Sequence, residues 1–347
     1  MKKTSIILFT VLCLCSKTQY CMKYLAAAIA NKQVKIWDKN FKDVKTLDTE
    51  NTPYSVIFIN GDKFLAVALS ENIDIYDTKN WKKIHTIKNK KSDIFCLKIS
   101  NDNKYLAGGD YANDKINIWK IKNIKNFVLK KTLDDGECFV NSMAFSNNNK
   151  YFAFKKNNPR YQKEDCVISI RDIPYWQEIT EDLNVPKGED IQSILFTNDD
   201  THLISCSNVN RKDTIKIWPG STIGCFSNPV KHDCDDILGI VKEIVLYKLY
   251  VTSLAISKNN KYLAMGGAKK IKILDLEKCK IPAKTNNGHK SDIRSIAFVN
   301  KDKNVLSASM DNTIKLWSLD KSLKEKNKIT CKDSVLSIAL STLSKNS

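Results

Sequence analysis

A unit of strands and polar turns recurs along this chain, and the repeat constrains the fold more than any other feature. In its clearest copy, residues 288–317, a strand, a turn, a second strand and another turn lead to a third strand that ends in Trp317. In the other copies the third strand ends at an equivalent position: Trp37, Tyr76, Trp119, Arg171, Trp218 and Leu274. Successive ends lie 39 to 56 residues apart, a period typical of a ring of small sheets.

The strands and turns within each copy predict the fold class. Segments such as 271–275 (IKILD) and 313–317 (TIKLW) alternate apolar and polar residues, as half-buried strands do. The turns NGDK, SNDNK, SNNNK, TNDDT and SKNNK are rich in Asn and Asp, which tolerate left-handed backbone. Fourth strands are visible at 44–47 and 83–87. We therefore predict an all-β, seven-bladed β-propeller of four-stranded antiparallel blades.

The two ends of the chain are predicted to meet in one blade. The first copy lacks a first strand, whereas residues 335–341 (VLSIALS) match 251–257 (VTSLAIS) position for position. The C-terminal strand should therefore complete the N-terminal blade, which closes the ring and removes open sheet edges.

The N-terminus resembles an export signal. Lys2 and Lys3 precede an uncharged, mostly apolar run at 5–15 (SIILFTVLCLC), which is too short to span a membrane. No small-x-small cleavage pattern follows, and the alternative is that residues 6–14 form a β-strand. We predict a signal peptide at 1–21, one propeller domain at 22–347, and a periplasmic or extracellular protein; the alternative is a cytoplasmic one. In an exported chain some of the eight cysteines that follow Cys21 could form disulfides.

The net charge of +18 permits two interpretations. Lys residues occur in every repeat and are rarely accompanied by Arg, which favours an evenly solvated surface. The alternative is a surface that binds nucleic acid or another polyanion.

The last repeat resembles the WD40 repeat family, as does the Ile-Trp-Asp run at 36–38. Its matching residues are Gly288, His289, Ser307, Asp311 and Trp317. In that family the His, Ser, Asp and Trp of one blade form a hydrogen-bonded network, so the resemblance implies a structural role for this tetrad. The other repeats depart from the motif. The position of His289 is taken by Glu50, Lys90, Gly136, Lys187, Tyr247 and Cys331, and Arg171 and Leu274 replace the Trp.

The sequence offers little support for catalysis. The four His residues (His85, His202, His232 and His289) belong to different repeats, and no Cys/His spacing suits zinc. No phosphate-binding glycine loop and no supported Ser/His/Asp arrangement is visible. We therefore predict no catalytic residue, no metal and no cofactor; an exported propeller enzyme remains the alternative.

Loop lengths indicate where a partner would bind. Turns between the first and second strands of each blade lie on one face of the disc, here called the first face. Turns between the second and third strands, and the links between blades, lie on the other, the second face. Long second-face segments occur at 155–165, 208–213 and 219–250 in blades 4 to 6, and long loops on a rigid scaffold commonly carry recognition. The last could instead supply the outer strand of blade 5.

We therefore expect a non-enzymatic scaffold, a monomeric disc that binds a protein partner within a complex. The candidate partner surface comprises Lys156, Arg160, Tyr161, Arg211, Lys212 and His232.

Overall fold

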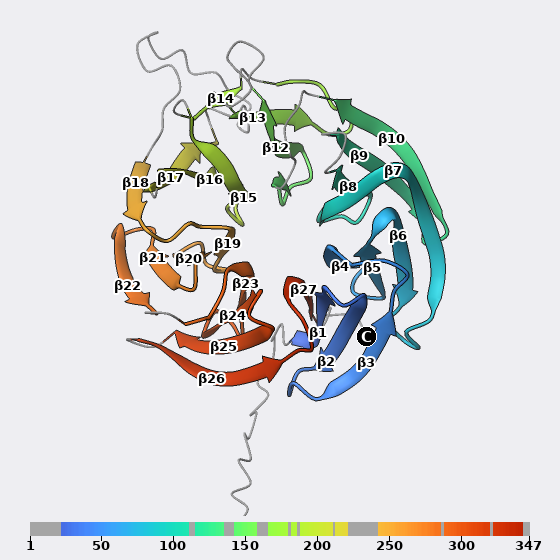
Figure 1. Ribbon diagram of the computed structural model, residues 1–347. Coiled ribbons are helices and arrows are strands. Elements are labelled where there is room, and N and C mark those ends of the chain that lie inside the picture. The colour runs from blue at the N-terminus through green and yellow to red at the C-terminus, as the bar shows by residue number, and fades with distance from the viewer. Residues whose placement is uncertain are drawn as a thin grey trace, which may run out of the picture.

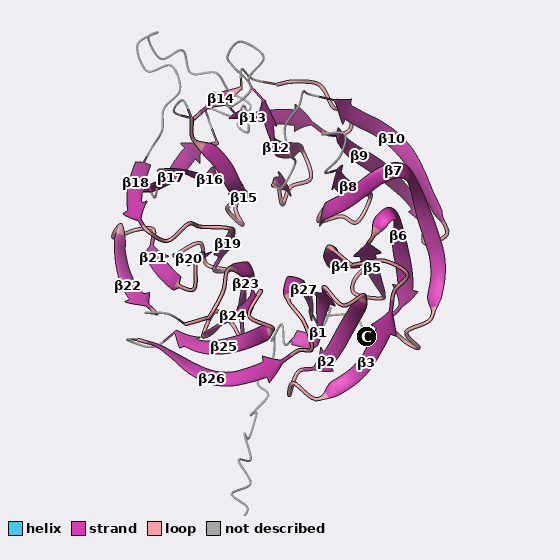
Figure 2. Cartoon of the chain, viewed as in Figure 1, coloured by secondary structure: helices cyan, strands magenta, loops and turns pink. Residues whose placement is uncertain are grey.

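The computed structural model describes residues 22–110, 115–134, 142–157, 166–179, 182–185, 188–210, 212–220, 242–285, 288–319 and 322–342. The predicted signal peptide lies outside these residues. The described residues form strands and turns without any helix (Figure 2), so no helix in this part of the chain could cross a membrane.

Seven four-stranded antiparallel blades surround a central axis (Figure 1), and the predicted fold class is confirmed. Blade 1 comprises β27 (Val335–Thr342), β1 (Met22–Ile29), β2 (Gln33–Asp38) and β3 (Asp43–Asp48). Blade 2 comprises β4 (Ser55–Ile59), β5 (Phe64–Ala68), β6 (Ser70–Asp77) and the first part of β7 (Lys83–Ile99). Blade 3 comprises the rest of β7 with β8 (Tyr105–Asp110), β9 (Lys115–Asn123) and β10 (Asn126–Asp134). Blades 4 and 5 comprise β11 (Met143–Phe145), β12 (Tyr151–Asn157), β13 (Cys166–Asp172) and β14 (Leu183–Asn184); and β15 (Asp190–Phe196), β16 (His202–Val209), β17 (Lys212–Pro219) and β18 (Lys242–Tyr247). Blades 6 and 7 comprise β19 (Ser253–Ile256), β20 (Tyr262–Gly266), β21 (Ile271–Asp275) and β22 (Lys280–Lys284); and β23 (Ile293–Val299), β24 (Asn304–Ser309), β25 (Thr313–Leu319) and β26 (Leu323–Thr330).

The C-terminal strand closes the ring, as the sequence predicts. β27 is the inner strand of blade 1 and pairs antiparallel with β1, with Leu340 opposite Leu25 and Ser337 opposite Ala28. The Tyr24 N–H also donates to Ser341 Oγ at 2.7 Å. β1 therefore has a hydrogen-bonded partner on both sides, β27 and β2, and is not left as a free edge at the join.

Blades 2 and 3 differ from the prediction at their junction. The sequence predicts separate strands at 83–87 and 94–99, whereas the structure has one continuous strand, β7. Its first part pairs with β6, where Ile87 lies opposite Ile73, and its second part pairs with β8, where Leu97 lies opposite Gly108. The connecting residues 88–92 contain no Gly or Pro, so nothing local ends the strand.

The hydrophobic core consists of layers between neighbouring blades. One layer joins Ala153 and Ile168 of blade 4 to Ile191, Ile194 and Trp218 of blade 5. Another joins residues of blade 7 to residues of blade 1. Each blade thus buries its apolar faces against its neighbours, and the ring is stabilised as a whole.

The first-face turns are also joined from blade to blade. Six equivalent turn residues adopt left-handed backbone with φ between 57° and 64°: Asp62, Asn103, Asn149, Asp200, Asn260 and Asp302. Several of their side chains accept a backbone N–H from the preceding turn. Asp200 accepts the N–H groups of Asn147 and Asn148, each at 2.7 Å, and Asp302 accepts that of Lys258 at 2.8 Å. These hydrogen bonds therefore link the first-face turns of neighbouring blades.

Candidate functional site

The four tetrad residues of blade 7 lie together in one hydrogen-bonded chain. The Trp317 indole N–H donates to Ser307 Oγ at 2.8 Å, and Ser307 Oγ lies 2.7 Å from His289 Nε2. His289 Nδ1 lies 2.9 Å from Asp311 Oδ2. Since the Ser307 oxygen accepts the indole N–H, its own proton can donate to Nε2, which leaves the His289 proton on Nδ1 facing Asp311.

This chain has the connectivity of a hydrolase triad, but its serine cannot serve as a nucleophile. Ser307 is fully buried and His289 is only 2% exposed. The Trp317 indole covers the Ser307 oxygen and uses it as an acceptor. A triad requires a serine that a substrate can reach, so this network stabilises the blade.

Burial sets the charge state of the pair. Burial lowers the pKa of His289, and the neighbouring Asp311 only partly opposes this. Burial alone would raise the pKa of Asp311, but hydrogen bonds from Thr313, the Lys290 N–H and His289 outweigh it and lower the pKa. A neutral imidazole beside an ionised carboxylate therefore satisfies every member at neutral pH.

Blade 4 replaces the tetrad with an ion cluster. Arg171, which stands at the Trp position, contacts Glu178 Oε1 at 3.0 Å and lies over the Phe154 ring at 5.9 Å. Lys156 contacts Glu178 at 3.0 Å and Asp182 at 3.1 Å, and its side chain is 12% exposed. Lys156 was predicted to face a partner, but its charge is already compensated within the blade.

Blade 5 uses a third arrangement, built on a carboxylate that sequence reasoning missed. Glu189 is buried and accepts hydrogen bonds from Ser207 and Thr214, with Lys212 Nζ 3.9 Å away. Lys212 was also predicted to face a partner, but its ammonium group lies close to the buried Glu189 carboxylate. Glu189 directly precedes β15, and a charged residue just before an apolar strand was the sequence signal that could have identified it.

The remaining predicted surface residues, Arg160, Tyr161, Arg211 and His232, lie outside the described residues. So do the central parts of the long second-face segments, 158–165 and 221–241. Within the described part of 219–250, β18 forms the outer strand of blade 5, which was one of the two predicted alternatives.

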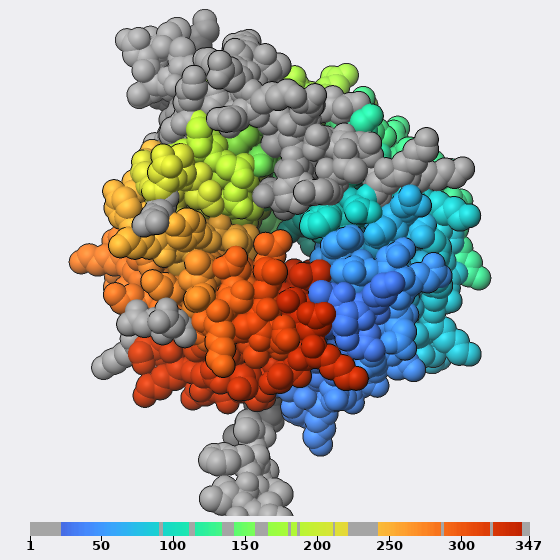
Figure 3. Space-filling view, in the orientation of Figure 1, coloured from blue at the N-terminus to red at the C-terminus, as the bar shows by residue number. Residues whose placement is uncertain are grey.

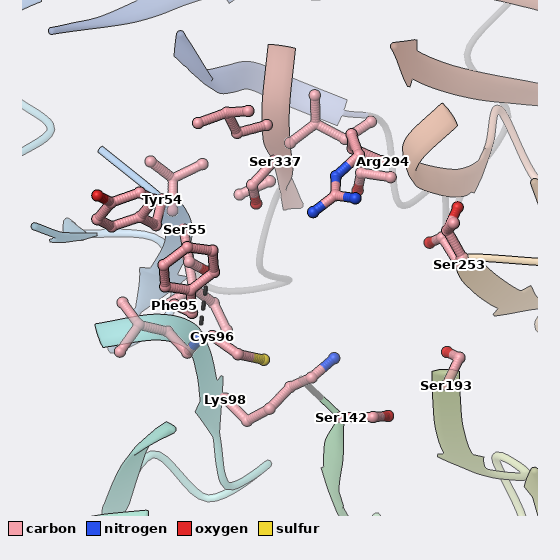
Figure 4. Close-up of a pocket in the computed structure, with 18 of the residues that line it drawn as sticks. Tyr54, Ser55, Phe95, Cys96, Lys98, Ser142, Ser193, Ser253, Arg294 and Ser337 are labelled. Atoms are coloured by element: carbon pink, nitrogen blue, oxygen red, sulfur yellow. Dashed lines mark hydrogen bonds between the residues drawn. The ribbon is translucent and has the colours of Figure 1, made fainter. Parts of the chain in front are cut away.

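A cavity lies on the ring axis, and the sequence analysis placed none of its candidate residues there. Its volume is about 460 Å³, and residues from all seven blades line it (Figure 4). A space-filling view shows the centre of the disc hollowed beside the red C-terminal strand (Figure 3). Each blade contributes one small residue to its lining at an equivalent position of the repeat, which is Ser in six of the seven blades: Ser55, Cys96, Ser142, Ser193, Ser253, Ser295 and Ser337.

Two of these serines also join neighbouring blades. Ser55 Oγ accepts the Leu97 N–H at 3.2 Å, and Ser142 Oγ accepts the Ile194 N–H at 2.7 Å. Accepting a backbone N–H leaves the hydroxyl proton available to donate into the cavity.

Three side chains reach the cavity through β-bulges. The register of the inner strand shifts between Ile94 and Cys96, between Ile191 and Ser193, and between Ile293 and Ser295. The extra residues are Phe95, Gln192 and Arg294, and all three line the cavity. A bulge leaves its extra residue out of the ladder and redirects the side chain. These residues follow the links between blades, so they lie at the second-face end of the cavity.

The cavity combines cations, hydroxyls and an aromatic pair. Figure 4 shows Lys98 and Arg294 both directed into the open space. Tyr54 and Phe95 stack on one wall, with ring centroids 4.3 Å apart. Burial raises the pKa of the Cys96 thiol, and Lys98 opposes this only in part, so the thiol is protonated at neutral pH.

No group of His, Cys, Asp and Glu among the described residues could hold a metal ion, and no disulfide joins two described cysteines. The cavity-lining residues that the structure describes include no His, Asp or Glu.

The ring is a β-propeller, and comparisons with known proteins show that the chain is similar to the WD40 family. The family "WD domain, G-beta repeat" (WD40) matches residues 81–120 and 280–318, which lie in blades 2 to 3 and 6 to 7. The resemblance seen in the sequence is thereby confirmed. WD40 proteins are generally non-enzymatic scaffolds for protein interactions.

Curated relatives share this class at low identity. The chain is 24% identical over 303 residues to protein NEDD1 of Homo sapiens, covering 79% of this chain and 45% of the relative. It is 24% identical over 339 residues to nuclear distribution protein PAC1 of Candida tropicalis, covering 85% and 64%. It is 25% identical over 206 residues to an intraflagellar transport protein 122 homolog of Xenopus tropicalis, covering 55% and 16%. The chain thus spans less than two thirds of the length of each relative.

Among solved structures, U3-55K is similar with a TM-score of 0.65 and 15% identity, covering 84% of this chain and 86% of the other. This likeness concerns the fold alone.

Proposed function

We propose that this chain is a non-enzymatic scaffold that binds a protein partner on its second face, over the long segments of blades 4 to 6 and the adjacent cavity mouth. One contrast carries the proposal. The first-face turns bond one another from blade to blade, whereas the long segments of blades 4 to 6 are predicted to lie on the second face, where the bulged residues Phe95, Gln192 and Arg294 line one end of a polar cavity. A rigid disc can present such a surface without rearranging.

The buried tetrad supports the non-enzymatic part of the proposal. Its Ser, His and Asp have the right connectivity for hydrolysis but no access. The described lining of the cavity offers hydroxyls and cations but no His, Asp or Glu, the commonest general bases.

The experiment shortens the blade 4 segment. Residues 158–165 are replaced by a two-residue turn, while Lys155 and Lys156 are kept because both form ion pairs within the disc. We expect an unchanged melting temperature and a fall of about tenfold in the yield of specifically co-purified partner, since a few contacts dominate most interfaces.

Lys324→Gln, on the exposed outer strand of blade 7, is the control and should retain the partner. Equal yield from the shortened chain would show that the partner binds elsewhere.

The net charge of +18 keeps a polyanion as the second candidate. It predicts binding to duplex DNA that weakens steeply as salt rises, because phosphate contacts release counterions. Weak binding to DNA that is indifferent to salt would contradict it.

We also propose export, with residues 1–21 as the leader. In support, the described strands of blade 1 begin at Met22 and need none of these residues. N-terminal sequencing of the protein from its native cell tests the proposal: a mature start near Cys21 is expected, and retention of Met1 would contradict it.

A further inference from the structure

The axial cavity carries positive charge that the described residues do not neutralise. Its lining contains Lys98 and Arg294 but no Asp or Glu among the residues that the structure describes. Both side chains are exposed within the cavity, and neither forms an ion pair or hydrogen bond with a described residue. The carboxylate of Asp190, just outside, is already bonded to Lys155 and to the Gln192 amide.

An anion would gain most from this arrangement. Two like charges facing one space between low-dielectric walls create a positive potential that a carboxylate can neutralise. The guanidinium of Arg294 offers a planar fork for a carboxylate, and the Lys98 ammonium adds donors from another blade. The hydroxyls of Ser55 and Ser142 retain protons to donate.

The size and the aromatic wall favour a chain segment as the source of that anion. A volume of about 460 Å³ suits a small group or a short peptide segment and excludes a nucleic-acid duplex. The stacked rings of Tyr54 and Phe95 line the same space and offer apolar contact to a residue beside the acid. The bulges at Phe95 and Arg294 direct both side chains to the second-face mouth.

We propose that the cavity receives an acidic peptide segment, whose side-chain carboxylate lies between Lys98 and Arg294 and whose neighbouring apolar residue packs on Tyr54 and Phe95. This inference rests on the proposed scaffold function and names the chemistry of the bound partner.

The test uses the full chain and two fluorescent peptides. One has a central Phe flanked by Asp and Glu, and the other replaces these by Asn and Gln. We expect the acidic peptide to bind at least about tenfold more tightly than its amide counterpart, and Arg294→Gln to raise its dissociation constant about tenfold. Lys98→Gln, on another blade, should act in the same direction and guards against a folding defect in the first variant.

Lys45→Gln, on the exposed outer strand of blade 1, makes the same charge change and should leave binding unaltered. Equal affinity for both peptides, or unchanged affinity in both cavity variants, would overturn the inference. Inorganic phosphate that binds more tightly than the acidic peptide would assign the site to a free anion instead. Binding of duplex DNA that is lost in the cavity variants would assign it to nucleic acid.

The two proposals fail separately. If partner capture depends on residues 158–165 but the acidic peptide does not bind, the scaffold surface stands and the cavity inference falls. If the peptide binds through Arg294 while the shortened chain keeps its partner, the site over blade 4 is wrong and the cavity inference stands.

Discussion

Asp311 is the most heavily bonded member of the tetrad. Its carboxylate accepts hydrogen bonds from His289, from the Lys290 N–H, and from both the N–H and the hydroxyl of Thr313. Asp311→Ala should lower the free energy of unfolding by about 3 kcal/mol, because it leaves these donors without their acceptor in a buried site. Urea unfolding measures the change. Asp43→Ala, on an exposed strand, should cost less than about 0.5 kcal/mol; an equal loss in both variants would remove the special role of Asp311.

His289 makes the last blade sensitive to acid. Its folded-state pKa lies below the ordinary value of 6.5, so the unfolded chain binds the proton more tightly. The stability that neutral His289 contributes is therefore complete above pH 6.5 and decreases as the pH falls toward the folded-state pKa. The stability that ionised Asp311 contributes is lost only as the pH falls below its ordinary pKa of 3.8.

His289→Gln should abolish that part of the acid sensitivity. Gln can hydrogen bond without titrating, so the variant should be less stable at pH 7.5 but lose less stability between pH 7 and pH 5. Urea midpoints across this range decide the matter. Parallel curves for the two proteins would show that other groups cause the wild-type slope.

At the scale of elements, local pattern predicted most strands because strand alternation and Asn/Asp turns are local properties. The join of β27 to β1 followed from one matching segment, since Val335 and Val251 begin the same motif. The continuity of β7 could not be predicted from the sequence, because it depends on whether the neighbouring strands β6 and β8 keep the link between blades 2 and 3 extended. The blade 4 ion cluster was missed for a similar reason: Arg171 and Lys156 meet Glu178 only once the blade is folded.

β27 should be indispensable despite its position at the end of the chain. Its Val335 is fully buried, and the strand covers the inner edge of β1. Removing 335–347 should lower the melting temperature by at least about 10 °C or cause aggregation, because the deletion opens a sheet edge and the core between blades 7 and 1. Removing only 343–347, which lie outside the described residues, is the control. Thermal melting and size-exclusion chromatography distinguish the two; a monomeric, equally stable product of the longer deletion would contradict the closure.

At the scale of the whole molecule, the cavity exists only because seven strands meet. Its serines recur at one equivalent position in six of the seven blades, with Cys96 in the other, and this recurrence is visible in the sequence once the repeats are aligned. The bulges that direct Phe95, Gln192 and Arg294 are not visible, because a register shift is a property of two paired strands. Loop length therefore led to a predicted partner surface on blades 4 to 6, whereas the polar cavity that the structure describes lies on the ring axis.

Hydrogen bonds between first-face turns link neighbouring blades, and a substitution at Asp200 tests this link most directly. Its carboxylate accepts the N–H groups of Asn147 and Asn148 across the junction of blades 4 and 5. Asp200→Gly removes the carboxylate while tolerating the backbone φ of 59°. Amide hydrogen exchange at Asn147 and Asn148 should accelerate about tenfold, the equivalent of a hydrogen bond worth about 1.4 kcal/mol.

Asp199→Ala is the matched control for this junction. Among the described residues, the Asp199 side chain bonds within its own turn, to Thr197 and Thr201, so its loss should leave exchange at Asn147 and Asn148 unchanged. Equal acceleration in both variants would mean that turn stability, rather than the link between blades, protects these amides. Acceleration confined to Asp200→Gly would show that hydrogen bonds between neighbouring blades hold the first-face turns together.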